Sequence, residues 1–254
     1  MGEDTFKGCT NLTNIWFGTA KPTTIYEQAY RRIMTATDGY SKITATITLP
    51  TRDKAEDLNI TSNSGAASYN YFGCQRKEND GSGFDFEFGF GFKPCENNMM
   101  QFGMYYSLKA NTGDEEIKDW RWVRPGTGGT KFYSFDYGTT HQVQLEAYDG
   151  KIKAVVRDEN NNLEYSGSWS FTGPVENGDH QIVRRVTSLL VPADEAATAK
   201  NYQWMSTDVG ESSTLKAANP LNCKATISTS GDSGWITVVT GAEYNQEKIS
   251  FDID

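Results

Sequence analysis

Hydrophobic and polar positions alternate strictly between Phe84 and Phe92, where the chain reads F-D-F-E-F-G-F-G-F. Successive side chains of a β-strand point to opposite faces, so this segment places five phenylalanine rings on one face. A helix would distribute the same rings around its circumference. The sequence therefore predicts a strand with one apolar face and an opposite face that carries Asp85, Glu87 and two glycines.

The same period of two, interrupted by turn signals, continues along most of the chain after residue 40. Y-D-G at residues 148–150 and N-N-N at 160–162 are typical of turns between paired strands. About a dozen short strands separated by turns predict an all-β fold, a two-sheet antiparallel β-sandwich. The expected strands are residues 43–49, 69–74, 84–92, 100–108, 119–123, 131–135, 141–147, 151–157, 163–171, 181–190, 202–205, 223–229 and 235–240.

The first 36 residues depart from this pattern, and we expect an N-terminal extension (1–36) followed by one sandwich domain (37–254). Apolar residues at helical spacing predict a short helix over residues 25–34: Ile25, Ala29, Tyr30 and Ile33. A second short helix is predicted on a connection at residues 192–200.

Three resemblances to known families bear on the fold. Residues 4–15, D-T-F-K-G-C-T-N-L-T-N-I, resemble one turn of a BspA-type leucine-rich repeat, F-x-G-C-x-x-L-x-x-I. A repeat array needs about three copies to be stable, so a severed repeat and a chance match both stay open. The hairpin at 142–156 resembles the later strands of concanavalin-like jelly rolls, which implies two curved sheets and a ligand on the concave face.

The third resemblance covers residues 40–254. Q-F-G-M-Y-Y-S at 101–107, the segment 120–125 and R-R-V-T-S at 184–188 are similar, in order, to the motifs of secreted bacterial proteins of the YrpD type. That family has no established activity, so the resemblance implies a compartment and a fold rather than a function.

Charge and composition exclude some partners. The net charge of -9 disfavours nucleic acids and anionic membranes, which bind clustered Lys and Arg. No apolar run approaches the roughly 18 residues of a transmembrane helix. Abundant Thr, Asn, Gly and Tyr with little Leu favour a secreted or cell-surface protein.

The four cysteines, Cys9, Cys74, Cys95 and Cys223, include no C-x-x-C pair, and the chain has two histidines, which argues against a zinc site. Cys74 and Cys95 flank the phenylalanine-rich strand and the turn before it, so we predict a disulfide between them. The alternative is four separate buried thiols.

Asp85 and Glu87 are the first candidate site. Side chains two residues apart on one strand face lie about 7 Å apart, which suits two carboxyls that flank a glycosidic bond. Concanavalin-like glycoside hydrolases carry a pattern like E-x-D-x-x-E, and the first and last acids of that pattern are missing here. The alternatives are a solvated face or a pair bound by Arg and Lys from adjoining strands.

Gln101 begins Q-F-G-M-Y, which resembles the glutamine strand of glutamic peptidases, enzymes that activate water with a Gln and a Glu. The resemblance implies that the Glu falls within residues 181–190, where this chain has Arg184 and Arg185 instead. Arginine does not give up its proton near neutral pH, so peptidase activity is not expected.

Aromatic and amide side chains complete the candidate site. Carbohydrate sites combine flat rings, which cover the apolar face of a sugar, with amides and carboxylates for its hydroxyls. For Trp120 and Trp122 the alternative is packing in the core or at an edge, and we expect structural roles for His141 and His180. The predicted ligand-binding residues are Asp85, Glu87, Gln101, Tyr105, Trp122 and Gln144.

No cofactor is required by these residues, although calcium stays open. The acidic segments at 114–116, 158–160 and 252–254 offer oxygen ligands, but none has the spacing of an EF-hand loop.

We therefore predict a monomeric, secreted or surface-attached module that binds carbohydrate or a cell-surface glycan without catalysis. One alternative is a polysaccharide-degrading enzyme with Glu87 as acid or base, assisted by Asp85. The other is an adhesin or toxin-like module that binds a protein.

Overall fold

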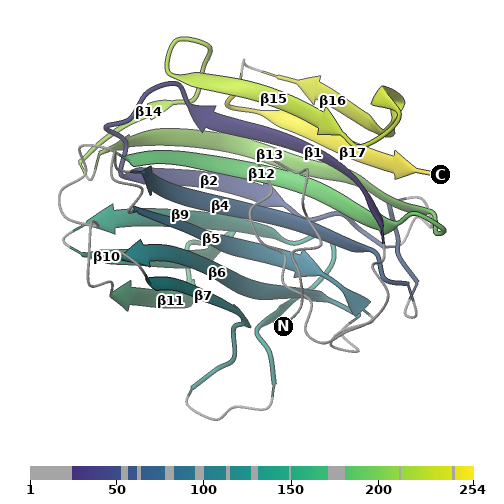
Figure 1. Ribbon diagram of the computed structural model, residues 1–254, viewed down its shortest axis with the longest axis horizontal. Coiled ribbons are helices and arrows are strands. Elements are labelled where there is room, and N and C mark those ends of the chain that lie inside the picture. Colours follow the sequence, from purple (N-terminus) through teal and green to yellow (C-terminus); the bar gives the residue numbers. More distant parts are fainter. Residues whose placement is uncertain are drawn as a thin grey trace.

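The computed structural model describes residues 25–52, 57–61, 64–77, 83–94, 100–112, 115–126, 131–148, 150–170, 181–211, 213–241 and 244–254. These residues form two antiparallel sheets packed face to face (Figure 1), which confirms the predicted all-β sandwich. Sheet A has the order β15-β1-β12-β4-β5-β6-β7 with β8 beside β6, and sheet B has the order β11-β10-β9-β2-β13-β17-β16 with β3 and β14 beside β13. The strands are β1 Tyr26–Thr35, β2 Lys42–Thr48, β3 Leu58–Asn59, β4 Ala67–Lys77, β5 Gly83–Phe92, β6 Phe102–Thr112, β7 Glu115–Trp122, β8 Ser134–Phe135, β9 Thr140–Tyr148, β10 Lys151–Asp158, β11 Leu163–Ser170, β12 Gln181–Pro192, β13 Ala197–Glu211, β14 Thr214–Ala217, β15 Cys223–Thr229, β16 Ile236–Thr240 and β17 Glu247–Ile253.

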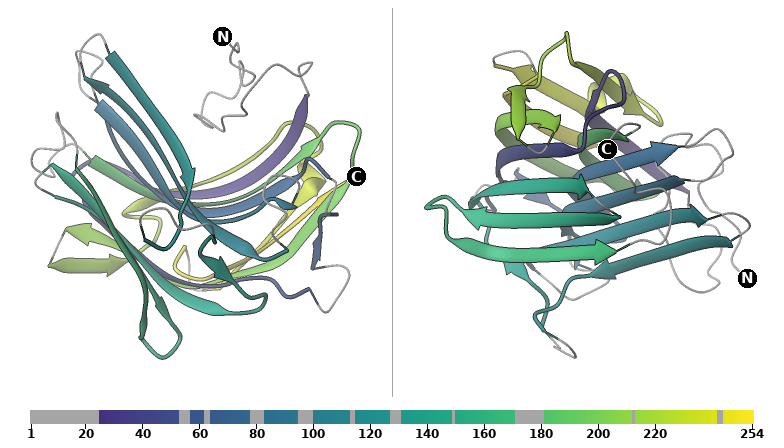
Figure 2. Two further views of the ribbon diagram at one scale, coloured as in Figure 1. Left: turned by 90° about the horizontal axis from the view of Figure 1, so that it is seen from below. Right: turned by 90° about the vertical axis from the view of Figure 1, so that its left-hand side faces the viewer.

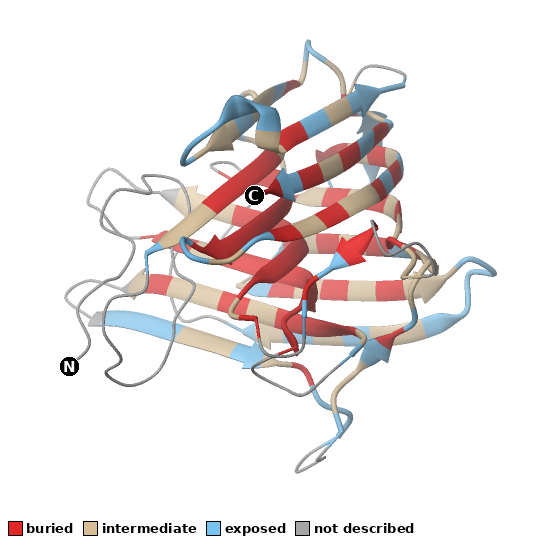
Figure 3. Cartoon of the chain, turned by 90° about the vertical axis from the view of Figure 1, so that its right-hand side faces the viewer, coloured by how far each residue is buried: buried red, intermediate tan, exposed pale blue. Residues whose placement is uncertain are grey.

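The sheets curve in the same sense, and sheet A lies on the inner side of the curve (Figure 2). One face of sheet A packs on sheet B, and its other face is concave and points away from the core between the sheets. Along strands such as β2, buried residues alternate with half-buried ones, which marks the face that meets the opposite sheet (Figure 3). Two curved antiparallel sheets of this kind are the architecture of a jelly roll. In the described residues, no helix is long and apolar enough to cross a membrane.

The five phenylalanines of β5 all lie in the core and are at most 4% exposed. Phe86 packs on Trp169 with ring centroids 4.8 Å apart, and Phe90 packs edge-on against Phe135 at 5.0 Å. Burying one such side chain contributes roughly 2 kcal/mol. A slip of one residue would expose the whole row, so these rings fix which face of β5 turns outward.

The segment predicted as a helix is strand β1, which pairs with β12 and β15 in sheet A. Ala29 and Ile33 are buried, and their spacing of four residues satisfies the periods of both a helix and a strand. Arg31 and Thr35 share that buried face, which is the period of a strand. The predicted helical extension is therefore wrong here, because β1 is part of the sandwich. Residues 4–15, which resemble a leucine-rich repeat, lie outside the described residues.

The predicted helix at residues 192–200 is also wrong. β12 ends at Pro192, a turn closed by the hydrogen bond from Glu195 N to Pro192 O follows, and β13 begins at Ala197. The predicted turns are confirmed instead, since Gly150 and Asn161 adopt positive φ angles of 70° and 66° between paired strands.

A buried ionic network connects the two sheets. Arg31 on β1 and Arg185 on β12 both donate to the carboxylate of Glu247 on β17, with Arg185 Nη2 2.8 Å from Glu247 Oε2. Arg185 also donates to Thr207 Oγ1 at 2.9 Å, and its guanidinium lies 4.7 Å from the ring centroid of Trp204. Glu247 and Arg185 have fully buried side chains, so water cannot replace either partner.

Cys74 is a free, buried thiol that donates to Gln181 Oε1 at 3.6 Å. The predicted disulfide between Cys74 and Cys95 is therefore wrong. Cys74 shares the core-facing side of β4 with Phe72, so its thiol is packed between the sheets, and Cys95 lies outside the described residues. Burial raises the pKa of Cys74 well above that of an exposed thiol.

Candidate ligand-binding site

The face of β5 opposite the phenylalanines carries Asp85 and Glu87 on the concave side of sheet A. The strand register places Glu87 directly between Gly73 on β4 and Ser107 on β6. Gly73 is in turn opposite Arg184 on β12. Four adjacent strands therefore contribute one row of positions to the concave face.

Arg184 connects the two carboxylates of this row. Its Nη2 lies 2.6 Å from Asp85 Oδ1 and 2.9 Å from Glu87 Oε1, and its Nη1 donates to Gln75 Oε1 at 3.2 Å. A Cβ atom on Gly73 would lie 2.7 Å from Arg184 Cζ, so this glycine lets the guanidinium cross β4. Pairing of the acids by an arginine, one of the alternatives considered from the sequence, is thus present, although Arg184 comes from β12, on the far side of β4, and not from a strand that adjoins β5.

Glu87 is 9% exposed, and burial raises its pKa to about 7. The adjacent Arg184 guanidinium opposes this rise, and the Asp85 carboxylate adds to it. For Arg184, burial alone would lower the pKa, but Asp85 and Glu87 outweigh burial and the guanidinium stays charged. Glu87 can therefore exchange a proton near neutral pH while Arg184 keeps its charge.

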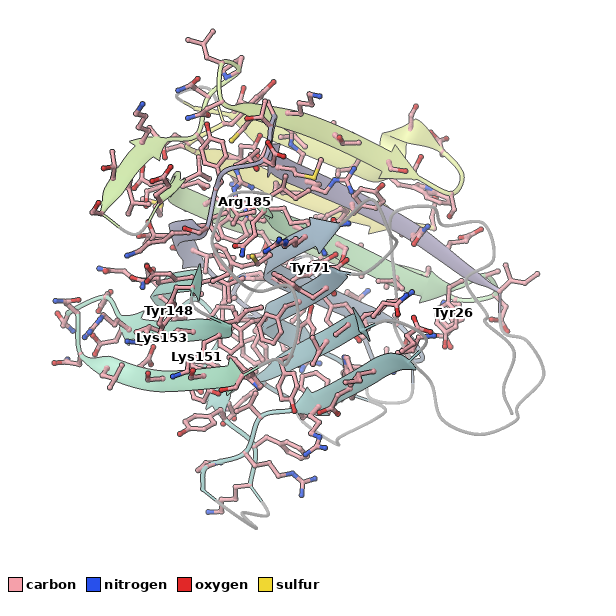
Figure 4. The ribbon with its side chains drawn as sticks, turned by 60° about the vertical axis from the view of Figure 1, so that its left-hand side comes forward. Tyr26, Tyr71, Tyr148, Lys151, Lys153 and Arg185 are labelled. Carbon is pink, nitrogen blue, oxygen red and sulfur yellow. The ribbon has the colours of Figure 1, made fainter. Side chains whose placement is uncertain are left out.

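A strip of aromatic side chains lies beside the charged row. Tyr71, Tyr105 and Trp122 occupy β4, β6 and β7 in the next row of the register, and Figure 4 shows Tyr71 on β4. The Tyr105 ring centroid lies 6.4 Å from that of Tyr71 and 6.0 Å from that of Trp122, which is 5.3 Å from that of Trp120. The tyrosines are buried, whereas both tryptophans are half-buried. This aromatic strip consists of Tyr26, Tyr30, Tyr69, Tyr71, Tyr105, Trp120 and Trp122, packed around Ala67, Val186 and Leu190.

Glycine makes room for these rings above β5. A Cβ atom on Gly91 would lie 2.9 Å from Trp122 Cη2 and 3.0 Å from Tyr69 Cδ1. Gly91 therefore serves ring packing on the concave face, whereas a Cβ atom on Gly89 would meet the backbone of β4, 2.1 Å from Asn70 O. Trp122 packs on the concave face instead of between the sheets.

The structure brings four of the six predicted ligand-binding residues onto the concave face: Asp85, Glu87, Tyr105 and Trp122. Gln101 precedes β6 and lies six residues from Ser107, so about 20 Å along the strand separates it from Glu87. It donates to Asp136 Oδ1 at 2.6 Å instead. The expectation that Gln101 adjoins Glu87 is thus wrong.

Gln144 lies on β9 in sheet B, on the face that points away from the core, where it donates to Glu146 Oε2 at 3.2 Å. Figure 4 shows the separation of the two strands: Tyr148, the last residue of β9, lies apart from Tyr71 on β4. The expectation that Gln144 shares a surface with Glu87 is wrong, because alternation fixes the face of a strand but not the sheet that the strand joins.

Sequence reasoning missed Arg184 and Tyr71 as members of this site. In the sequence, Arg184 belongs to the R-R-V-T-S motif and argues against a peptidase, but neither feature indicates a binding role. β12 is buried on both faces, so its sequence has no clear alternation that would have aimed Arg184 at the concave side. Tyr71 was placed on a predicted strand, but only the register shows it next to Glu87.

His141, near the start of β9, is buried and forms hydrogen bonds at both ring nitrogens. Nδ1 lies 2.6 Å from Glu164 Oε2, and Nε2 lies 2.7 Å from Thr139 Oγ1. The ring also contacts Phe90 and Phe135. These contacts fit the structural role expected for it; His180 lies outside the described residues.

Within the described ranges, no group of three His, Cys, Asp or Glu side chains is arranged to hold a metal ion. The Asp158 carboxylate, from one of the three acidic segments, accepts hydrogen bonds from Asn160 N and Asn162 N and so stabilises the turn. Calcium binding elsewhere stays a prediction.

Comparisons with known proteins support the fold. No protein-family model and no curated protein matches the chain. Among solved structures, it is similar to Scytalido-glutamic peptidase bound to a peptide-based transition-state analogue, with a TM-score of 0.55 and 10% identity over 90% of this chain and 100% of that one. It is also similar to SCP-B, an eqolisin-family peptidase in complex with the tripeptide Ala-Ile-His, with a TM-score of 0.52, 10% identity and the same coverage.

An alginate lyase from Klebsiella pneumoniae aligns more loosely, with a TM-score of 0.33 and 9% identity over 77% of this chain and 61% of that one. At these identities the two peptidases show a shared sandwich fold alone. The class defined by fold and site together is therefore a jelly-roll protein with a charged and aromatic concave face.

Proposed function

We propose that the concave face of sheet A binds a carbohydrate chain without catalysis, in a protein that is secreted or held at the cell surface. One observation carries this proposal: half-buried Trp120 lies in register with Ser107 and Glu87 of the polar row, and half-buried Trp122 lies in the adjacent row, opposite Tyr105. Flat rings and hydrogen-bonding groups thus adjoin on one surface.

The two kinds of side chain suit different parts of a sugar. Indole rings cover the apolar face of a pyranose, and carboxylates accept hydrogen bonds from its hydroxyls. Arg184 holds Asp85 and Glu87 in fixed orientations, so little side-chain entropy is lost when a ligand binds. Asp85 has the more accessible carboxylate, with a side chain that is 16% exposed against 12% for Glu87.

Trp120→Ala should weaken glycan binding by about tenfold or more, because it removes a ring of the accessible edge of the aromatic strip. A glycan array would identify a ligand, and isothermal titration calorimetry would give Kd for the wild type and the variant. Gln144→Ala is the matched control, since Gln144 lies on the outer face of sheet B and its loss should leave Kd unchanged. Equal binding by the Trp120 variant and the wild type would reject the proposed surface.

Polysaccharide hydrolysis is the second candidate, and the state of Glu87 favours it. A carboxyl whose pKa is raised to about 7 can donate a proton to a leaving oxygen near neutral pH. Asp85 and Glu87 contact one Arg184 nitrogen at 2.6 and 2.9 Å, so the contacting oxygens lie at most about 5.5 Å apart. That upper bound is compatible with the spacing of about 5–5.5 Å between the carboxyl groups of enzymes that retain anomeric configuration.

If this candidate is correct, Glu87→Gln should lower reducing-end release from a bound polysaccharide by about 100-fold or more while binding persists. Incubation of wild type and variant with the glycans found on the array, followed by a reducing-sugar assay, measures the effect. Absence of release by the wild type from every bound glycan would leave the non-catalytic proposal standing and reject hydrolysis.

A further inference from the structure

Arg32 on β1 lies on the concave face in the same register row as Val186 and Tyr71. Its guanidinium carbon is 5.8 Å from the ring centroid of Tyr30. Burial raises the pKa of Tyr71, and the positive charge of Arg32 is one of the charges that oppose this rise. The Arg32 guanidinium therefore interacts electrostatically with a tyrosine of the aromatic strip.

The arginines of the sandwich differ in how their charge is balanced. Arg184 is occupied by Asp85, Glu87 and a glutamine, and Arg185 by Glu247. In the part of the chain that the structure describes, Arg32 forms no ion pair, and its buried Nε atom has no hydrogen-bond acceptor. Arg32 therefore offers an unused positive charge on the concave face.

Ser188 on β12 supplies a second unsatisfied group beside it. Ser188 is 1% exposed, and its hydroxyl has no partner among the described residues. It lies directly opposite Tyr30, which makes it a diagonal neighbour of Arg32, about 7–8 Å away across the strand pair. Ser188 also lies opposite Tyr69, so both groups are surrounded by rings of the aromatic strip.

Both groups require the same complement. A guanidinium can only donate, and a buried hydroxyl that lacks a partner destabilises the fold until a hydrogen bond satisfies it. A carboxylate has two oxygens and can accept from both groups at once. Neutral sugar hydroxyls would leave the charge of Arg32 unbalanced.

We propose that the carbohydrate bound on the concave face is acidic, and that a sugar carboxylate pairs with Arg32 and Ser188. This inference rests on the proposed function and adds the class of ligand. An acidic saccharide fits better than an acidic peptide because the half-buried Trp120 and Trp122 lie on the same face. The net charge of -9 disfavours unspecific binding of polyanions, so binding that depends on Arg32 is diagnostic.

The test is calorimetry with oligogalacturonate, its fully methyl-esterified form, cellohexaose, a sulfated carrageenan oligosaccharide and a poly-glutamate peptide. Wild type should bind oligogalacturonate most tightly. Arg32→Gln should weaken that binding by about tenfold or more, and Arg32→Lys by less, because lysine keeps the charge without the planar fork. Ser188→Ala should weaken it several-fold. Arg157→Gln, on β10 of sheet B, is the control and should change nothing.

The outcomes separate this inference from the proposed function. Equal binding of cellohexaose and oligogalacturonate, unchanged by Arg32→Gln, would overturn the acidic ligand and leave carbohydrate binding intact. Tighter, Arg32-dependent binding of the sulfated saccharide would overturn the carboxylate. Binding of poly-glutamate alone, or of no saccharide, would overturn both proposals. Among the described residues Arg32 has no ion pair to lose, so Arg32→Gln should fold, which circular dichroism would verify.

Discussion

Glu247→Gln should lower the free energy of unfolding by about 3–5 kcal/mol, the largest loss we expect from a single conservative change in this protein. The substitution keeps the shape of the side chain but removes the one carboxylate shared by Arg31 and Arg185. Two guanidinium groups would then remain in the core without a negative partner. Urea denaturation followed by tryptophan fluorescence measures the effect, and a thermal scan should show a decrease in Tm of roughly 10 °C.

Two further variants test whether charge balance is the cause. Glu116→Gln removes an exposed carboxylate that pairs with Lys109 and Lys118, and it should cost no more than about 1 kcal/mol. Arg31→Met removes the surplus positive charge and leaves the Arg185–Glu247 pair intact, so it should cost less than Glu247→Gln. A greater loss in Arg31→Met than in Glu247→Gln would contradict the argument from charge.

The pH dependence of stability should report the environment of Glu87. The folded-state pKa of Glu87 is raised from 4.5 to about 7, mainly by burial, so the folded protein binds the proton more tightly than the unfolded chain does. Its contribution to stability is therefore fully present below about pH 4.5 and is lost as the pH rises through 7. A shift of this size corresponds to at most about 3 kcal/mol.

The difference in unfolding free energy between wild type and Glu87→Gln isolates this group. Measured from pH 4.5 to 8, the difference should move against the wild type by up to about 3 kcal/mol. Gln144→Ala removes no ionisable group, so its curve should run parallel to that of the wild type. A flat difference for Glu87→Gln would mean that Glu87 stays ionised throughout, held by Arg184, and that burial does not dominate.

The contrast between β5 and β1 shows where sequence reasoning succeeds. In β5 every second residue is Phe, and only a strand can gather those rings on one face. In β1 the spacing of Ala29 and Ile33 fits a helix and a strand equally. Arg31 on β1 and Arg185 on β12 are buried because Glu247 from the other sheet pairs with both. No local pattern contains that partner.

The chain by itself determined the all-β class, the turns at Gly150 and Asn161, and the face on which Asp85 and Glu87 lie, because these follow from alternation and local backbone preference. Only the tertiary structure decided that Arg184 crosses Gly73 to bind both acids, and that Gln144 belongs to the other sheet. Strand order and register join residues about 100 positions apart, and neither is encoded in the period of a single strand.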